Sequence, residues 1–328
     1  MTPDLPTELK IVLERKTEGL SRNDAARRAE IISQNYRGGG DSKTIGTDDD
    51  ALAYALARMP ATYAAVAACL TAMIETRSDF APASLLDVGA GPGTATWAAM
   101  AAFSSLRDFT LLDSNNSLRG LALEFARSVP ALSPMNYQQG DALKLLANAP
   151  SAELVIASYL AGELGDVERA KLADAMWAKA SDTLMIVEPG TPAGYARIIE
   201  LRERLIASGA HVIAPCTHDN ACPLVAPDWC HFSQRLARSR AHKHLKGAEL
   251  PYEDEKFSYV VLSREAISPR PARVLAQPKI SKVAVTMKLC TSNGVEVATA
   301  LHRDKQNYSR AKKLNWGDAY PQKNSMPE

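Results

Sequence analysis

The sequence of 328 residues lacks the features that would place it in a membrane or a secretory pathway. No apolar run approaches the roughly 20 residues that a membrane-spanning helix needs. The N-terminal segment MTPDLPTELK has neither the apolar core of a secretory signal nor the Arg-rich amphipathic pattern of a transit peptide. We therefore expect a cytoplasmic protein with no membrane partner.

Net charge is also nearly absent, but its distribution is uneven. The chain carries 38 Lys and Arg against 37 Asp and Glu, a formal net charge of +1. Residues 231–328 hold 18 Lys and Arg against 9 Asp and Glu, so the rest of the chain is acidic. A basic C-terminal region fits a surface that faces phosphates, although a solvated face has the same composition. Nucleic acid is therefore a candidate partner.

The chain divides into three regions. Residues 1–80 show helical spacing, interrupted at residues 37–50 by a Gly- and Asp-rich segment that is either a flexible link or a functional lid. Residues 81–208 alternate strand-like runs with helical segments, which predicts an α/β fold with a parallel doubly wound sheet. Residues 209–328 contain four of the five cysteines and end in strand-like runs. We expect this last region to complete the sheet and to add a β extension, a meander or a small barrel.

A glycine-rich turn follows the first strand-like run, in the segment LLDVGAGPGT. Gly89, Gly91 and Gly93 let the backbone approach a ligand closely before a helix begins near Thr94. The acid Asp87 stands just before the glycines, and the dinucleotide pattern G-x-G-x-x-G fails because residue 94 is Thr. These two details favour S-adenosylmethionine (SAM) over NAD.

This segment resembles the class I SAM-dependent methyltransferases, whose ligands bind at the C-terminal ends of successive strands. The resemblance implies that Asp113 accepts hydrogen bonds from the ribose hydroxyls and that Asp141 contacts the adenine amino group. Ser158 and Tyr159 would face the methyl group. Each residue also has an ordinary explanation as a polar group at a strand end. The residues expected at the pocket are Asp87, Gly89, Ala90, Gly91, Gly93, Asp113, Asp141, Ala142 and Ser158.

The signatures of two classes of nucleic-acid methyltransferase are missing. Amino-directed enzymes resemble one another in an Asp/Asn-Pro-Pro-aromatic motif after the fourth strand, where this chain reads Ser158-Tyr159-Leu160-Ala161. Cytosine C5 enzymes need a Cys nucleophile near the fourth or fifth strand, and no Cys occurs between Cys69 and Cys216. Tyr159, Glu163 and Glu188 could orient a substrate, although Glu188 also suits the capping of a turn. No catalytic residue is identified, and the methyl acceptor stays open.

Four cysteines gather in the C-terminal region, at Cys216, Cys222, Cys230 and Cys290. Without a secretory signal a disulfide framework is disfavoured, whereas four thiolates suit an iron–sulfur cluster or a structural zinc ion. The spacing differs from the C-x-x-C knuckles typical of zinc, so we favour iron–sulfur and keep zinc as the alternative. His218 and His231 are substitute ligands or ordinary loop residues. Cys69, in an Ala-rich helix, fits a small buried apolar residue.

Several segments together resemble the ribosomal small-subunit methyltransferase-like family, which includes mitochondrial small-subunit assembly proteins and bacterial relatives. These segments are GAGPGTA, PCTHDNACPL, DWCHFSQR, DEKFSYVVLSR and AKKLNWGD, and the resemblance covers about residues 50–320. It implies SAM binding at Gly89, Gly91 and Asp113, and association with small-subunit rRNA during assembly. It also implies a [4Fe-4S] cluster on Cys216, Cys222, Cys230 and Cys290.

Two basic segments follow the predicted ligands. The first basic segment comprises Arg235, Arg238, Arg240, Lys243 and Lys246, and the second comprises Arg303, Lys305, Arg310, Lys312 and Lys313. Tyr308 and Trp316 are interleaved with the second segment, and Trp316 also suits a core anchor. Cations would neutralise phosphates while aromatic rings stack on exposed bases. We predict that the cysteine centre pins the two segments together.

The leading hypothesis is a monomeric SAM-dependent methyltransferase that acts on rRNA or a ribosomal protein in the assembling small subunit. The alternative is a non-catalytic RNA-binding assembly factor that keeps the SAM fold as a scaffold, with structural zinc in place of iron–sulfur. A small-molecule methyltransferase explains neither the cysteines nor the basic tail.

Overall fold

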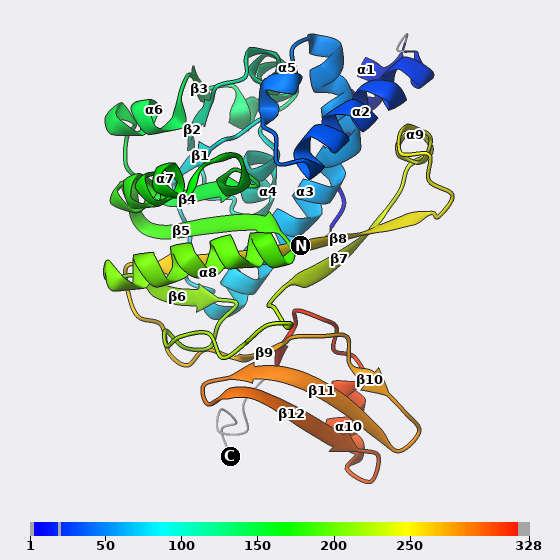
Figure 1. The fold of residues 1–328 in the computed structure, drawn as a ribbon, viewed down its shortest axis with the longest axis vertical. Helices are drawn as coiled ribbons and strands as arrows, with labels where there is room; N and C mark the ends of the chain where they lie inside the picture. Colours follow the sequence, from blue (N-terminus) through cyan, green and yellow to red (C-terminus); the bar gives the residue numbers. More distant parts are fainter. Residues whose placement is uncertain (1–2, 19–20, 321–328) are drawn as a thin grey trace.

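The computed structural model describes residues 3–18 and 21–320, and its largest element is one sheet with helices on both faces (Figure 1). The strands are β1 (Ser84–Val88), β2 (Asp108–Asp113), β3 (Asn136–Gln139), β4 (Ala152–Ser158), β5 (Ala180–Pro189), β6 (His211–Ala214), β7 (Phe232–Ala237) and β8 (Tyr252–Ser263). Their order is β3-β2-β1-β4-β5-β8-β6, and β7 also pairs with β8. Strands β1 to β5 are parallel, whereas β8 is antiparallel to its neighbours. The predicted parallel doubly wound sheet is confirmed, with one antiparallel strand added.

Two layers of helices enclose this sheet. The first core contains residues of α1 (Thr7–Thr17), α2 (Arg22–Arg37), α3 (Asp48–Thr76), α4 (Thr94–Ala102) and α5 (Asn116–Ala126), and the second contains residues of α6 (Ala142–Asn148), α7 (Asp166–Lys179) and α8 (Pro192–Ala207). Successive strand residues point to opposite faces, so Leu85 enters the first core and Leu86 the second. Short helices η1 (Ser42–Thr44), η2 (Pro130–Leu132), η3 (Ala161–Glu163) and α9 (Arg240–Leu245) lie in the connections.

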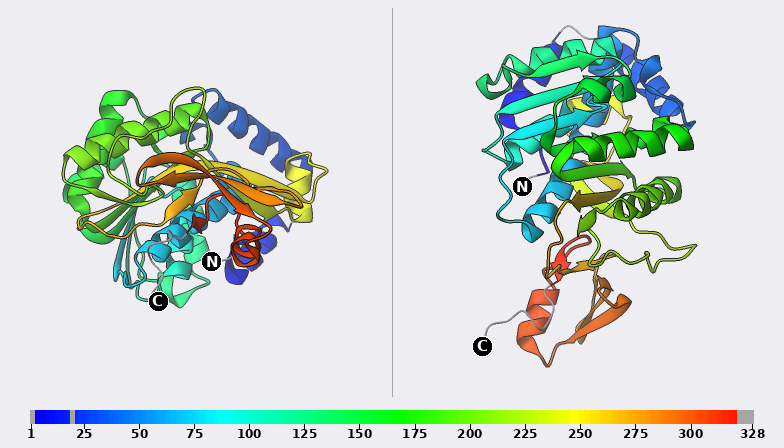
Figure 2. Two further views of the ribbon diagram at one scale, coloured as in Figure 1. Left: turned by 90° about the horizontal axis from the view of Figure 1, so that it is seen from below. Right: turned by 90° about the vertical axis from the view of Figure 1, so that its left-hand side faces the viewer.

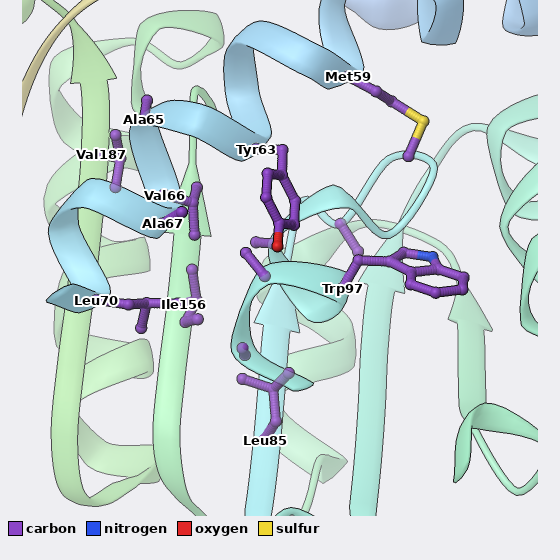
Figure 3. Packing of buried hydrophobic residues seen from close by; sticks show 14 of the residues in the cluster. Met59, Tyr63, Ala65, Val66, Ala67, Leu70, Leu85, Trp97, Ile156 and Val187 are labelled. Carbon is purple, nitrogen blue, oxygen red and sulfur yellow. The ribbon is translucent and has the colours of Figure 1, made fainter. Parts of the chain in front are cut away.

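The long helix α3 is the centre of the first core. It begins with a capping box between Thr47 and Asp50 and contains Pro60. Leu70 lies against Ile156 of β4 (Figure 3). By length and composition this helix could cross a membrane, which corrects the expectation that the chain has no such run. However, 72% of the apolar window is buried inside the protein, which is the behaviour of a core helix.

A C-terminal module, residues 269–320, forms a second sheet at one end of the first (Figures 1 and 2). Its strands are β9 (Ala272–Val274), β10 (Lys279–Ile280), β11 (Ala284–Thr291), β12 (Gly294–Leu301) and β13 (Ala319–Tyr320), and α10 (Lys305–Ala311) packs on one face. Strand β11 pairs antiparallel with β9, β10 and β12. The predicted β extension is present, and β10, β11 and β12 form a meander.

Strands β6 and β7 pair with different parts of the same edge of β8. Strand β6 pairs with residues 261–263 and β7 with residues 252–257, while β5 pairs along the other edge. The chain between them, residues 215–231, leaves the sheet in the gap and carries three of the four clustered cysteines. We call this segment the cysteine loop.

Candidate cofactor cleft and cysteine centre

The glycine-rich turn lies at the carboxyl edge of the sheet, among the ends of neighbouring strands. Val88 of β1 is in register with Leu112 of β2 and Ala157 of β4, and the Gly89 N–H donates to the Leu112 carbonyl at 2.8 Å. The structure therefore brings the predicted residues after β1, β2, β3 and β4 to one edge. Ligands of doubly wound sheets bind at this edge.

The three glycines take a backbone conformation that other residues avoid. Gly89, Gly91 and Gly93 have φ values of +70°, +54° and +78°. A Cβ atom at Gly89 would lie 2.8 Å from a Leu160 methyl group. Ala90 is buried, and its N–H also donates to the Leu112 carbonyl at 3.1 Å. The turn thus allows close backbone approach. A side chain at Gly89 is disfavoured both by the positive φ and by the contact with Leu160.

Asp87 lies behind the turn, with its side chain fully buried. One carboxylate oxygen accepts hydrogen bonds from the Thr96 N–H at 3.1 Å and the Thr96 hydroxyl at 2.7 Å. The other oxygen is buried without a partner in the described part of the chain. Burial raises the pKa of Asp87 to about 7. In this structure Asp87 holds the first turn of α4 to β1.

Asp113 ends β2 and contacts the glycine turn directly. Its carboxylate accepts the Gly91 N–H at 2.9 Å and the Asn115 N–H at 2.7 Å, and burial raises its pKa. Each carboxylate oxygen keeps acceptor capacity beyond one hydrogen bond, so ribose hydroxyls can be added to these contacts. Tyr137 of β3, which the sequence analysis missed, donates its hydroxyl to the Gly91 carbonyl at 2.7 Å.

The remaining predicted pocket residues lie at the ends of β3 and β4. Asp141 is exposed and caps α6, where its carboxylate accepts the Lys144 N–H at 3.0 Å. Ala142, the first residue of α6, and Ser158, the last residue of β4, are half-buried. These positions are compatible with the predicted contacts, and the capping role of Asp141 supplies its structural explanation.

The turn after β4 is fixed by hydrogen bonds within the protein. Tyr159 has a φ of +59°, and its hydroxyl donates to Glu255 at 2.8 Å. Glu188 is fully buried and accepts the Ala161 N–H at 3.0 Å and the Arg197 side chain at 2.7 Å. Glu188 therefore orders the turn, which agrees with its interpretation as a turn-capping residue.

Residues 38–47, which we call the strap, pack on the same edge of the sheet. The Asn115 side-chain amide donates to the Ser42 carbonyl at 3.0 Å and the Ile45 carbonyl at 2.8 Å. The Ser42 N–H donates to Glu163 at 3.4 Å, and Ile45 is buried in the first core. Burial raises the pKa of Glu163 to about 7. These contacts argue against a flexible link, and the interpretation as a functional lid stays a prediction.

The four clustered cysteines line one small cavity of about 30 Å³. Cys216, Cys222 and Cys230 come from the cysteine loop, and Cys290 comes from β11 of the C-terminal module. Residues 3–18 and 21–320 contain no group of three or more His, Cys, Asp or Glu side chains arranged to hold a metal ion, and their cysteines are free thiols. The structure brings the thiols to a shared cavity without giving them ligand geometry.

The surroundings of these thiols are apolar and also contain hydrogen-bond donors. Burial raises the pKa of Cys216 and of Cys230, and it raises the pKa of Cys290 to about 11. The other thiols of the cavity add to these shifts, because neighbouring negative charges oppose ionisation. The Tyr195 hydroxyl lies 3.2 Å from the Cys222 sulfur. A bound metal cation would be needed to hold four thiolates together here.

The two histidines of the cysteine loop are placed differently. His218 is buried, and its Nδ1 has no partner in the described part of the chain. His231 stacks on Trp229, with ring centroids 4.9 Å apart, and meets Trp316 edge-on at 4.6 Å. Trp316 also packs against the first core, as its interpretation as an anchor requires.

The first basic segment is largely neutralised within the protein. Arg235 pairs with Asp254 at 2.7 Å, and Arg238 and Lys246 pair with Glu253 at 3.3 and 2.5 Å. The side chain of Arg240 lies outside the described residues. The prediction that both segments face RNA is therefore weakened for the first one, because its cations already have carboxylate partners.

The second basic segment is exposed at α10 and its flanks. Within the described ranges, Arg303, Lys305, Arg310, Lys312 and Lys313 form no ion pair with a carboxylate. The Lys312 ammonium lies over the Tyr308 ring at 5.6 Å, and the Tyr308 hydroxyl donates to the Ser281 carbonyl at 2.7 Å. These cations remain available to a partner.

The strand order, the antiparallel β8 and the glycine turn after β1 define the fold of a class I methyltransferase. Within that class, residues 48–321 match the family described as "Mitochondrial small ribosomal subunit Rsm22", and the chain belongs to this family.

Curated relatives agree with the family assignment. The chain is 28% identical over 301 residues to the human "Ribosome assembly protein METTL17, mitochondrial", covering 84% of this chain and 63% of the relative. It is 27% identical over 259 residues to "Rsm22-cox11 tandem protein 2, mitochondrial" of Schizosaccharomyces pombe, covering 70% of this chain and 34% of the relative. The chain thus spans only part of the length of these relatives.

Solved structures that match the chain have low sequence identity and low TM-scores. A putative RNA methyltransferase from Pyrococcus horikoshii has a TM-score of 0.41 and 11% identity, covering 61% of this chain and 84% of its own. The SAM-bound magnesium protoporphyrin IX methyltransferase of Synechocystis has a TM-score of 0.42 and 13% identity, covering 79% and 98%.

The expected cytoplasmic location is wrong by this comparison. The family and the relatives that match are described as mitochondrial. The expectation rested on a missing targeting pattern at the N-terminus, and a missing pattern does not identify a compartment.

Proposed function

We propose that this protein is an assembly factor of the small ribosomal subunit. In this proposal a SAM-binding methyltransferase fold is joined, through a cysteine-ligated [4Fe-4S] cluster, to a module that binds rRNA. The family description and the names of the relatives support the ribosomal role and make the mitochondrial small subunit the first particle to test. The protein would act as a monomer, which light scattering can check.

The observation that carries the proposal is the origin of the four cysteines. Three come from the loop that leaves the main sheet between β6 and β7, and the fourth comes from the central strand of the C-terminal module. A metal centre on these residues would cross-link the two parts of the molecule. Four thiols that share one cavity, with Cys290 buried and the other three half-buried, are a suitable donor set for an iron–sulfur cluster or a zinc ion.

The C-terminal module has the charge that an RNA-binding surface requires. Residues 269–320 contain ten Lys and Arg against three Asp and Glu. Arg270, Arg273 and Lys288 pair with carboxylates, whereas the second basic segment is free within the described residues. Unpaired cations around one short helix would neutralise phosphates, and their number would set the salt dependence of binding.

The cofactor proposal rests on the carboxyl edge of the sheet. The backbone of Gly89, Gly91 and Gly93 would approach SAM, Asp113 would accept its ribose hydroxyls, and Asp141 and Ala142 would lie beside its adenine. Bound SAM would supply a methyl group near Ser158. Asp87 would act indirectly, by holding the turn and α4 in place.

A non-catalytic assembly factor is the second candidate, and one observation favours it. The groups best placed to orient a methyl acceptor after β4 are occupied, since Tyr159 is bonded to Glu255 and Glu188 to Ala161 and Arg197. A protein that uses the fold only as a scaffold could keep this arrangement. In this candidate the cysteines would hold structural zinc.

Calorimetric titration with SAM, followed by a radiolabelled-methyl assay on immature small subunits, separates the two candidates. Binding followed by transfer supports the enzyme, binding without transfer supports the scaffold, and the absence of SAM binding contradicts the cofactor proposal. Metal analysis of the anaerobically purified protein decides between iron with sulfide and zinc. A protein that takes up neither contradicts the proposed centre.

A further inference from the structure

Arg202 of α8 is a buried cation at the wall of the cysteine cavity. Its side chain lines this cavity together with Cys216, and the residue is 1% exposed. One terminal nitrogen donates to the main-chain carbonyls of His218 and Asn220, each at 2.8 Å. Its Nε is buried and has no partner in the described part of the chain.

Arg202 differs from the other buried arginines of the protein in its charge partners. Arg77 pairs with Asp182 at 3.1 Å, Arg169 with Asp166 at 2.6 Å, and Arg273 with Glu75 at 3.1 Å. Within residues 3–18 and 21–320, Arg202 forms no ion pair with a carboxylate. The acid of the cysteine loop, Asp219, is paired with Arg270 at 2.6 Å instead.

A buried charge without a counter-charge is costly, so its position calls for a negative group close by. The sulfur atoms that line the same cavity are the candidates. Arg202 and Cys216 line the same cavity of about 30 Å³. The Tyr195 hydroxyl, on the same helix, lies 3.2 Å from the Cys222 sulfur. Helix α8 therefore presents two donors toward two of the thiols.

We propose that Arg202 is the counter-charge of the cysteine centre. Its guanidinium compensates the net negative charge of a thiolate-ligated metal centre and donates hydrogen bonds on the side of Cys216. This inference rests on the proposed function, because it requires a metal centre on the four cysteines. Hydrogen bonds and positive charge near cluster sulfurs stabilise the reduced state, so Arg202 also raises the reduction potential of a bound [4Fe-4S] cluster.

The test compares Arg202→Met and Arg202→Lys with the parent, and uses Arg77→Met as a matched control. Arg77 is also a buried arginine, but it has a carboxylate partner away from the cysteine cavity. In the anaerobically reconstituted protein, Arg202→Met should release its metal to a chelator roughly 10- to 100-fold more readily. Its cluster potential, measured by an EPR-monitored titration, should fall. Arg202→Lys should retain part of both properties, and Arg77→Met should change neither.

The thermal stability of the metal-free and metal-loaded forms gives a second readout. In metal-free Arg202→Met, removal of an uncompensated buried charge offsets the lost hydrogen bonds to His218 and Asn220, so this form should lose less thermal stability relative to its parent than the metal-loaded variant loses. Equal destabilisation of both forms, or unchanged metal release and potential, would overturn the role of Arg202. A parent that binds neither iron nor zinc would instead overturn the proposed metal centre itself.

Discussion

At the scale of single residues, the glycine turn shows how one backbone conformation dictates a residue type. Gly89 has a φ of +70°, and a Cβ there would meet Leu160 at 2.8 Å. We expect Gly89→Ala to cost about 1–2 kcal/mol from backbone conformation alone and to weaken SAM binding further. Gly120→Ala, in the exposed part of α5 with nothing within 4 Å, is the control and should be neutral or slightly stabilising. Chemical denaturation and SAM titration of both variants check this.

Asp87 gives a prediction about pH. Its pKa is about 7 in the folded protein and 3.8 in the reference state, so the folded form holds its proton more tightly. The stabilising contribution is therefore complete below about pH 4 and is lost as pH rises toward 7. Relative to Asp87→Asn, which cannot titrate, the parent should lose up to roughly 4 kcal/mol of unfolding free energy across that window. The unfolding free energies of both proteins are measured by denaturation as a function of pH. If the two profiles run parallel, Asp87 does not cause the loss of stability.

At the scale of elements, the strap is held in part by two side-chain hydrogen bonds that one substitution can remove. The Asn115 amide nitrogen donates to Ser42 and Ile45, while its oxygen caps α5 through the Leu118 N–H at 3.0 Å. Asn115→Asp keeps the cap and removes both donors. We expect faster hydrogen exchange in residues 38–47 with little change in global stability, and SAM should slow this exchange in the parent. An unchanged exchange rate in the variant would mean that these contacts do not hold the strap.

Elements buried on both sides could be predicted from the sequence, whereas long-range pairings could not. The runs that became β1, β2, β4 and β5 are apolar because both faces of these strands are covered. Strands β6 and β7 were missed, because β6 is short and β7 is polar along much of its length. Both strands depend on pairing with β8, across the cysteine loop for β6 and across the connection that contains α9 for β7.

Strand pairing that the sequence does not reveal also explains why the first basic segment was wrongly expected to be free for RNA. Arg235 lies directly opposite Asp254 in the register between β7 and β8, and this register is a property of the folded sheet. Arg202 and Tyr195 were missed for a related reason, since the helical spacing of α8 gives no sign that one face of this helix lies beside cysteines farther along the chain. The cysteines themselves were identifiable because their clustering is visible in the sequence.

At the scale of the whole molecule, we expect the second basic segment to contribute to RNA affinity and the first, whose cations are paired, to contribute little. Neutralising the second segment to Gln should lower affinity for small-subunit rRNA. It should also reduce the dependence of log affinity on log salt by about 0.7–0.9 for each phosphate that the protein no longer neutralises. Neutralising Arg235, Arg238 and Lys246 is the control, because these cations are already paired. Equal decreases in affinity from the two sets would show that the ion pairs do not remove the first segment from the binding surface.

In the proposed function, a metal centre on the four cysteines joins the methyltransferase fold to the basic C-terminal module, and rRNA binding depends on this link. The most direct measurement is the affinity of the metal-loaded parent and of the quadruple Cys→Ser variant at Cys216, Cys222, Cys230 and Cys290 for small-subunit rRNA at one salt concentration. Cys69→Ser, at the fifth cysteine, controls for the loss of a buried thiol away from the cavity. We expect the quadruple variant to lose specific rRNA binding and Cys69→Ser to retain it. Normal rRNA binding by a folded quadruple variant would show that the cysteine centre is not needed to hold the RNA-binding surface.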